Sequence, residues 1–179
     1  MSNPLVRTVI RTKFLLTARN SATNSIIRVK NLYLELAARL SPQEGSRAVT
    51  VPPMIGVDPE MQGWSFFQIL EHNAIVNRMI SYTVEKLARG EDPKQERPIN
   101  HKTDVLHKGL SGPEQVEAFR ESLDTYLSMV AAFPTLRGTA ETPHPIFGPL
   151  NAHKWHCMFD FHLRLHLKQA ETVISFLER

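Results

Sequence analysis

Cysteine is almost absent from this chain. Cys157 is the only one in 179 residues, so no intramolecular disulfide can form and a reducing compartment is favoured. Long apolar runs are also missing, since none approaches the roughly 20 residues that cross a bilayer. The opening segment "MSNPLVRTVIRTKFLLTARN" is interrupted by Arg7, Arg11 and Lys13, which leaves no uncharged core for a secretory signal. We therefore expect a cytoplasmic protein with no membrane partner.

Acidic residues are scarce in the first forty positions. That segment has seven Lys or Arg and a single acid, Glu35, whereas the remainder has fourteen (21 − 7) against seventeen (18 − 1). A basic segment can contact nucleic acid or a membrane surface. No interleaved aromatic residues and no nucleic-acid-binding motif accompany these charges. A solvated helix face is the favoured interpretation, and no nucleic-acid partner is expected.

Proline, by contrast, is plentiful but unevenly placed. The twelve prolines leave four long stretches without one, at 5–41, 60–92, 114–133 and 150–179. Because a proline inside a helix costs about 3 kcal/mol, these stretches predict helices near 21–40, 65–89, 113–133 and 151–177. A hydrophobic content of 42% over this length suits one core. We predict an all-α, four-helix bundle with long proline-rich connections over 21–179, preceded by a basic arm or short helix over 1–20.

Local signals support the last three helices. Ser65 with Gln68, and Ser111 with Glu114, have the spacing of a capping box, and Asn151 can cap the final helix. Apolar or inward-facing residues recur at spacings of three and four in two of the stretches. These residues are Val116, Phe119, Leu123, Tyr126, Val130 and Phe133 in one, and Trp155, Phe159, His162, His166, Gln169, Val173 and Phe176 in the other.

The stretch "HLRLHLKQ" places two histidines on the inward stripe of the last helix. At about 100° per residue, His162 and His166 lie about 40° apart, so both are expected to face the core. His153 and His156 fall away from this stripe and are expected to be solvated. Cys157 also projects away from it and is expected to be a small buried residue rather than a ligand.

A third inward histidine would turn this pair into a metal site. An imidazole without partners in an apolar interior costs a few kcal/mol, and a shared metal ion would satisfy several at once. Three neutral imidazoles leave coordination positions open, as in catalytic sites. The alternative is three core histidines satisfied by each other, by Gln68 or Gln169, or by buried water. The candidate third ligand is His72, whose apolar neighbours at helical spacing are Ile69, Ile75, Val76 and Met79.

Two familiar metal motifs do not fit. The zincin pattern needs glutamate directly after the first histidine, and here that position is Leu163. Carboxylate-bridged di-iron bundles need Glu-x-x-His on a helix. The one such spacing runs from Glu141 to His144 and contains Pro143. Neither the zincin base nor a di-iron site is therefore expected.

The segments "WSFFQILEHN" (64–73) and "HPIFGPLNAHKWHCMFDFHLRLHLKQ" (144–169) resemble the DinB-like superfamily of four-helix-bundle metalloenzymes, in a branch of unknown function. The resemblance covers roughly residues 20–179. It implies that the metal histidines fall on His72, His162 and His166. It also implies a divalent ion such as zinc, nickel or iron.

The resemblance implies chemistry as well as a fold. Characterised relatives include thiol-dependent transferases and isomerases, in which the metal activates a low-molecular-weight thiol. A metal-dependent hydrolase and a non-catalytic metal-binding protein are the alternatives. His144 is the candidate catalytic acid or base, although "HPIFGPL" could equally just shape the turn before the last helix. We expect a small-molecule substrate, and a homodimer because Val6, Val9, Ile10, Leu15 and Leu16 add apolar surface.

Overall fold

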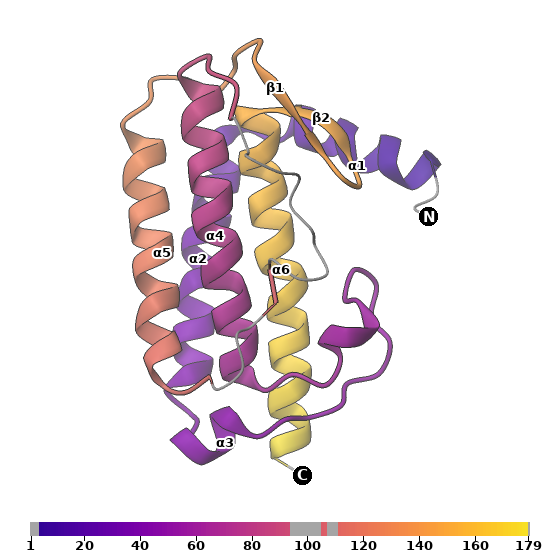
Figure 1. The fold of residues 1–179 in the computed structure, drawn as a ribbon, viewed down its shortest axis with the longest axis vertical. Coiled ribbons are helices and arrows are strands. Elements are labelled where there is room, and N and C mark those ends of the chain that lie inside the picture. The colour runs from indigo at the N-terminus through magenta and orange to yellow at the C-terminus, as the bar shows by residue number, and fades with distance from the viewer. Residues whose placement is uncertain (1–3, 94–104, 107–110, 179) are drawn as a thin grey trace.

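The computed structural model describes residues 4–93, 105–106 and 111–178 (Figure 1), with side chains from residue 7 on. Along the chain, its elements are the helices α1 (Pro4–Leu16), α2 (Arg19–Ala37), α3 (Pro42–Ser46), the 3-10 turn η1 (Pro59–Met61), α4 (Phe66–Ala88), α5 (Glu114–Ala131), the strands β1 (Glu141–His144) and β2 (Gly148–Asn151), and α6 (Ala152–Leu177).

Four long helices form the bundle. α4 packs against α5 and α6, and α2 packs against the same two helices from the opposite corner. α2 and α6 run in one direction, and α4 and α5 in the other (Figure 1). The core between them is built from large buried side chains that include Tyr33, Phe66, Phe119, Tyr126 and Phe159. None of the described helices is long and apolar enough to span a membrane.

The predicted all-α bundle is confirmed, and its helix starts have the expected caps in two cases. The Ser65 side chain accepts a hydrogen bond from the Gln68 N–H, and the Gln68 side chain accepts one from the Ser65 N–H at 2.8 Å. Asn151 accepts from the Lys154 N–H at 3.0 Å. The proposed capping by Ser111 is wrong: α5 begins after Pro113, and Ser111 instead donates a hydrogen bond to Glu71.

A short hairpin was not expected from the sequence. β1 and β2 pair antiparallel, with His144 opposite Gly148 at the turn. Gly148 has a φ of 70°, a conformation that glycine adopts without strain. The segment that forms the two strands is too short and too rich in proline to show the alternation of apolar and polar residues that indicates a strand. His144 therefore lies at the end of a strand and not in the irregular loop expected from the sequence.

The basic arm forms helix α1, which lies across one end of the bundle beside the hairpin (Figure 1). Phe14 anchors it, with ring centroids 5.5 Å from Phe147 and 6.2 Å from Phe161. Val9, Leu15 and Leu16 remain exposed. Homodimerisation through such surface stays a prediction.

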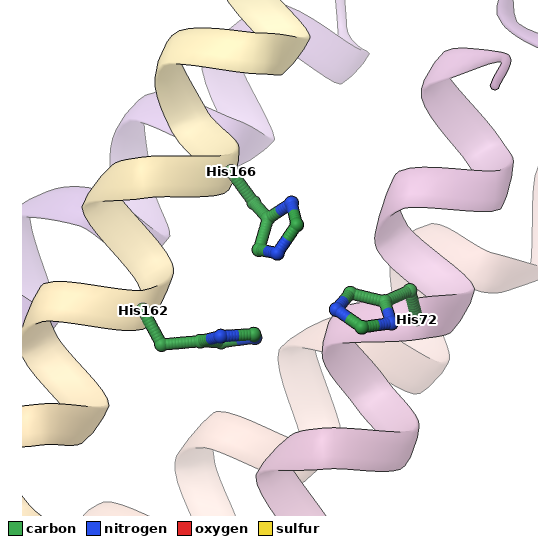
Figure 2. A group of neighbouring side chains, drawn as sticks. All are labelled: His72, His162 and His166. Atoms are coloured by element: carbon green, nitrogen blue, oxygen red, sulfur yellow. The ribbon is translucent and has the colours of Figure 1, made fainter. Parts of the chain in front are cut away.

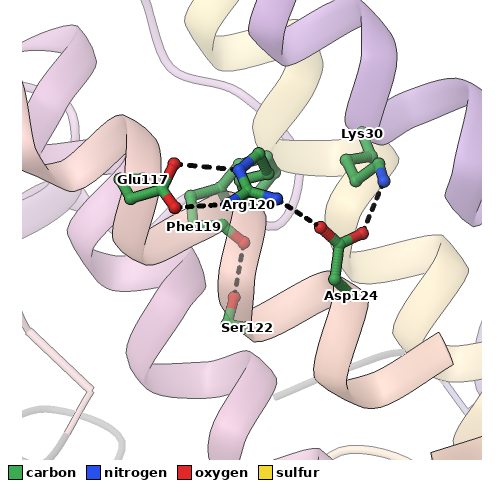
Figure 3. A network of polar contacts seen from close by, with 6 residues as sticks. All are labelled: Lys30, Glu117, Phe119, Arg120, Ser122 and Asp124. Carbon is green, nitrogen blue, oxygen red and sulfur yellow. Dashed lines mark hydrogen bonds and ion pairs between the residues drawn. The ribbon is translucent and has the colours of Figure 1, made fainter. Parts of the chain in front are cut away.

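A charged network, exposed except at the partly buried Lys30, connects α2 with α5 (Figure 3). Lys30 Nζ lies 2.6 Å from Asp124, which also receives a 2.9 Å contact from Arg120, and Arg120 pairs with Glu117 one turn away. Exposed pairs of this kind typically contribute no more than about 1 kcal/mol each. The network therefore aligns the two helices without dominating their stability.

His153 and His156 are buried, so the expectation that they are solvated was wrong. α6 packs against α1, α2, α4 and β2, and its far face is consequently covered as well. His156 bridges two helices: Tyr126 Oη lies 2.7 Å from Nδ1, and Thr23 Oγ1 lies 3.0 Å from Nε2. Because Thr23 donates its own proton to the Arg19 carbonyl, His156 donates from Nε2 and accepts from Tyr126 at Nδ1.

The neutral state of His156 should make folding stability sensitive to acid. Burial is the main cause that lowers its pKa from 6.5 to about 4. The unfolded chain therefore binds a proton between these values that the folded chain does not, and stability falls as pH drops below 6.5. Between about pH 7 and about pH 5.5 the parent should lose about 1 kcal/mol more than His156→Gln in urea unfolding. Equal losses in the two proteins would contradict this assignment.

Candidate metal centre

Three histidines converge between α4 and α6. His72 projects from α4, and His162 and His166 project from successive turns of α6 toward it (Figure 2). Their ring centroids are 5.3 Å apart for His72 and His162 and 4.6 Å apart for each of the other two pairs. One nitrogen from each ring lies within 4.8 Å of the others. The structure thus brings together all three residues that the sequence nominated as ligands.

The ring of His72 is oriented by a backbone carbonyl. Its Nδ1 lies 2.6 Å from the carbonyl oxygen of Val105, which can only accept a hydrogen bond. Nδ1 therefore carries the proton, and the lone pair of the neutral ring is on Nε2. Trp64 packs beside this ring, at 5.2 Å between centroids.

His166 is oriented by a side-chain amide. Its Nδ1 lies 2.8 Å from Gln169 Oε1, and Gln169 Nε2 donates to the carbonyl of Met61 at 2.7 Å. The second contact fixes which end of the amide faces the imidazole, because a carbonyl cannot donate. His166 therefore also donates from Nδ1 and keeps its lone pair on Nε2, as metal-bound histidines usually do.

His162 is the more open member of the cluster. The residue is only partly buried, yet its Nε2 is inaccessible and has no hydrogen-bond partner in the part of the chain that the structure describes. Burial, followed by the neighbouring imidazoles of His166, His72 and His144, holds the pKa of His162 well below 6.5. Burial also lowers the pKa of His166 to about 4. Both rings are therefore neutral near pH 7, the state that binds metal.

His144, the candidate acid or base, lies at the end of the hairpin. Its ring is 4.9 Å from that of Phe147 and 5.2 Å from that of Trp155. Its Nδ1 accepts from the backbone N–H groups of Ile146 and Phe147 at 3.1 and 3.3 Å. The neutral ring therefore carries its proton on Nε2, which makes it a hydrogen-bond donor rather than a base at that atom.

The donor set fits a divalent transition metal. Imidazole nitrogens suit zinc, nickel, iron and copper, and a buried imidazole nitrogen without a partner, as at His162, is costly unless something binds it. Sequence reasoning placed Gln169 on the inward face and named it as a possible hydrogen-bond partner of the core histidines, a contact that the structure shows for His166 three residues before it. The carbonyls of Val105 and Met61 could not have been found, because a backbone acceptor has no sequence signature.

The fold and the site define a four-helix bundle with a histidine cluster between two helices. A sequence model of the DinB superfamily matches residues 25–170, and the chain belongs to this superfamily. The chain is also similar in fold to a solved four-helix bundle protein, TT2238, with a TM-score of 0.58 and 20% identity over 84% of this chain and 96% of that one. No curated protein matches the chain.

The orienting role of Gln169 can be tested by two substitutions. Gln169→Leu removes the acceptor for His166 and should weaken divalent-metal affinity by about 10- to 100-fold. Gln169→Glu keeps an acceptor and should retain most of that affinity, although it cannot donate to the Met61 carbonyl. Competition with a chromophoric chelator measures both. Equal affinities in the parent and the leucine variant would exclude the role.

Proposed function

We propose that His72, His162 and His166 hold one divalent metal ion and that the chain is a metal-dependent enzyme. The observation that carries this proposal is the orientation of the rings. His72 and His166 donate outward from Nδ1 to Val105 and Gln169, which leaves their Nε2 lone pairs directed at one another and at His162. The buried Nε2 of His162, which has no hydrogen-bond partner among the described residues, would be satisfied by an ion shared with these two rings.

Thiol chemistry is the best-supported activity for this site. A bound divalent ion with open positions lowers the pKa of a coordinated thiol or water and so supplies a nucleophile near neutral pH. Activation of water for hydrolysis is usually assisted by a general base. Among the described residues the converging groups are three imidazoles, and no carboxylate joins the cluster. This favours a thiol-dependent transferase or isomerase over a hydrolase, which remains the second candidate.

His144 is proposed as the residue that donates a hydrogen bond to the reacting group. Its Nδ1 accepts from two backbone amides, which opposes protonation of that atom, so the neutral ring acts as a donor through Nε2–H. A ring held in this way can donate to a developing negative charge on a substrate or leaving group. The position on a rigid hairpin end rather than a loose loop supports that role.

Replacement of a ligand tests the metal centre itself. His162→Ala should abolish stoichiometric binding of zinc or cobalt and, by removing the stabilisation that binding confers, should lower the melting temperature of the metal-loaded protein. His153→Ala is a matched control, because it removes another buried histidine of α6 that lies outside the cluster. A triple alanine variant that kept the metal content of the parent would place the site elsewhere.

The catalytic role of His144 is tested in the metal-loaded protein. With a low-molecular-weight thiol and a panel of electrophilic acceptors, His144→Phe should lower kcat by about 100-fold or more, the usual contribution of a hydrogen-bond donor to charge that develops in the transition state. Metal content should be unchanged, because His144 is not among the converging ligands. Unaltered turnover would show that His144 only shapes the turn. Ester hydrolysis without thiol, assayed in parallel, would favour the hydrolase instead.

A further inference from the structure

The indole N–H of Trp155 is a buried hydrogen-bond donor that nothing in the site described so far uses. Trp155 is partly exposed as a residue, but its Nε1 is inaccessible and has no acceptor among the described residues. Leaving a buried donor unsatisfied costs about 1–3 kcal/mol. A polar atom in this state, next to a candidate active site, is expected to meet its partner when a ligand binds.

Trp155 shares the helix face of the metal ligands. It precedes His162 by seven residues, which is almost two full turns and roughly 10 Å along the axis of α6. Its ring lies 5.2 Å from that of His144. The partly exposed residues His144, Trp155 and His162 therefore form a row from the hairpin to the most open ligand of the cluster.

We infer that Trp155 is a specificity-determining residue whose Nε1–H binds an acceptor oxygen of a substrate held at the three-histidine site. This inference rests on the proposed function. The proposed ligand is a small thiol that carries a carboxylate a few bonds from its sulfur. The sulfur would lie at the three histidines and the carboxylate at Trp155. A carboxylate is favoured over a donor group because the indole nitrogen can only donate a hydrogen bond. The neighbouring His144 ring, with Nδ1 accepting from two backbone amides, likewise presents an N–H at Nε2 and not a lone pair that would repel the carboxylate oxygen.

The test uses cobalt-loaded protein and a matched set of probes. Mercaptoacetate, 3-mercaptopropionate and 4-mercaptobutanoate are titrated against ethanethiol, propanethiol and butanethiol, and the thiolate-to-cobalt charge-transfer band reports binding. At least one acid should bind more tightly than its alkyl counterpart. Trp155→Phe keeps an aromatic side chain but removes the N–H donor. It should weaken binding of that acid by about tenfold, the loss of one hydrogen bond to a charged acceptor, without changing the affinity for the alkyl thiol.

Trp64→Phe is the control, since it removes the indole N–H of a different tryptophan, whose ring packs against His72. This variant should change the affinities for the acids and for the alkyl thiols by the same factor. An independent readout is the indole N–H resonance of Trp155 in the zinc-loaded parent. That resonance should move downfield with the preferred acid and not with its alkyl counterpart.

Results of two kinds would overturn the inference, the first of which concerns Trp155 itself. Trp155→Phe could weaken both probe classes equally or neither, or the Trp155 resonance could fail to distinguish the acid from the alkyl thiol. Absence of a cobalt spectrum in the parent overturns the proposed function and the inference with it. A normal cobalt spectrum without a thiolate band from any probe leaves the metal site in place but overturns the thiol chemistry and the inference with it. Both failures are distinguishable from a loss of the Trp155 effect alone, in which thiolate bands are present.

Discussion

The hydrogen bonds that His72 and His166 donate from Nδ1 determine how the rest of the site is arranged. Each bond selects one tautomer and one ring orientation, and both leave the lone pair on the inward nitrogen. Without these two acceptors the rings could rotate to form hydrogen bonds with each other, and the cluster would be an ordinary set of core histidines. The helices bring the rings to one level, whereas their chemical state is set by the acceptors behind them.

One of those acceptors, and the group that holds the other in place, lie outside the four long helices. The carbonyl of Met61, which fixes Gln169, belongs to the connection before α4, and the carbonyl of Val105 belongs to the connection after it. The long proline-bearing connections therefore have a structural role at the site as well as a topological one. Met61 and Val105 also contribute buried side chains to the core, which ties the placement of their carbonyls to packing.

Much of this architecture could be predicted because it depends on patterns that repeat along a helix. The capping of α4 by Ser65 and the inward direction of His162 and His166 follow from spacing alone. The errors have physical causes. His156 was expected to be solvated because periodicity identifies one buried stripe, whereas α6 is covered on more than one side. Ser111 has the spacing of a cap, but its hydroxyl bonds Glu71 on another helix, and a tertiary contact of that kind leaves no trace in local sequence.

The position of the ligands along the chain has a consequence for how the fold closes. His72 lies on α4 and His162 on α6, so an ion held by both joins points 90 residues apart (162 − 72). Such a link would restrict the unfolded chain in the way that a disulfide across the same span does. The entropic cost of closing a loop grows slowly with the length of the loop. In a chain whose lone cysteine cannot form an internal disulfide, the histidine cluster is, among the described residues, a place where a bound ion would form a reversible cross-link. Unlike a disulfide, that cross-link opens with acid or a chelator rather than with a reductant.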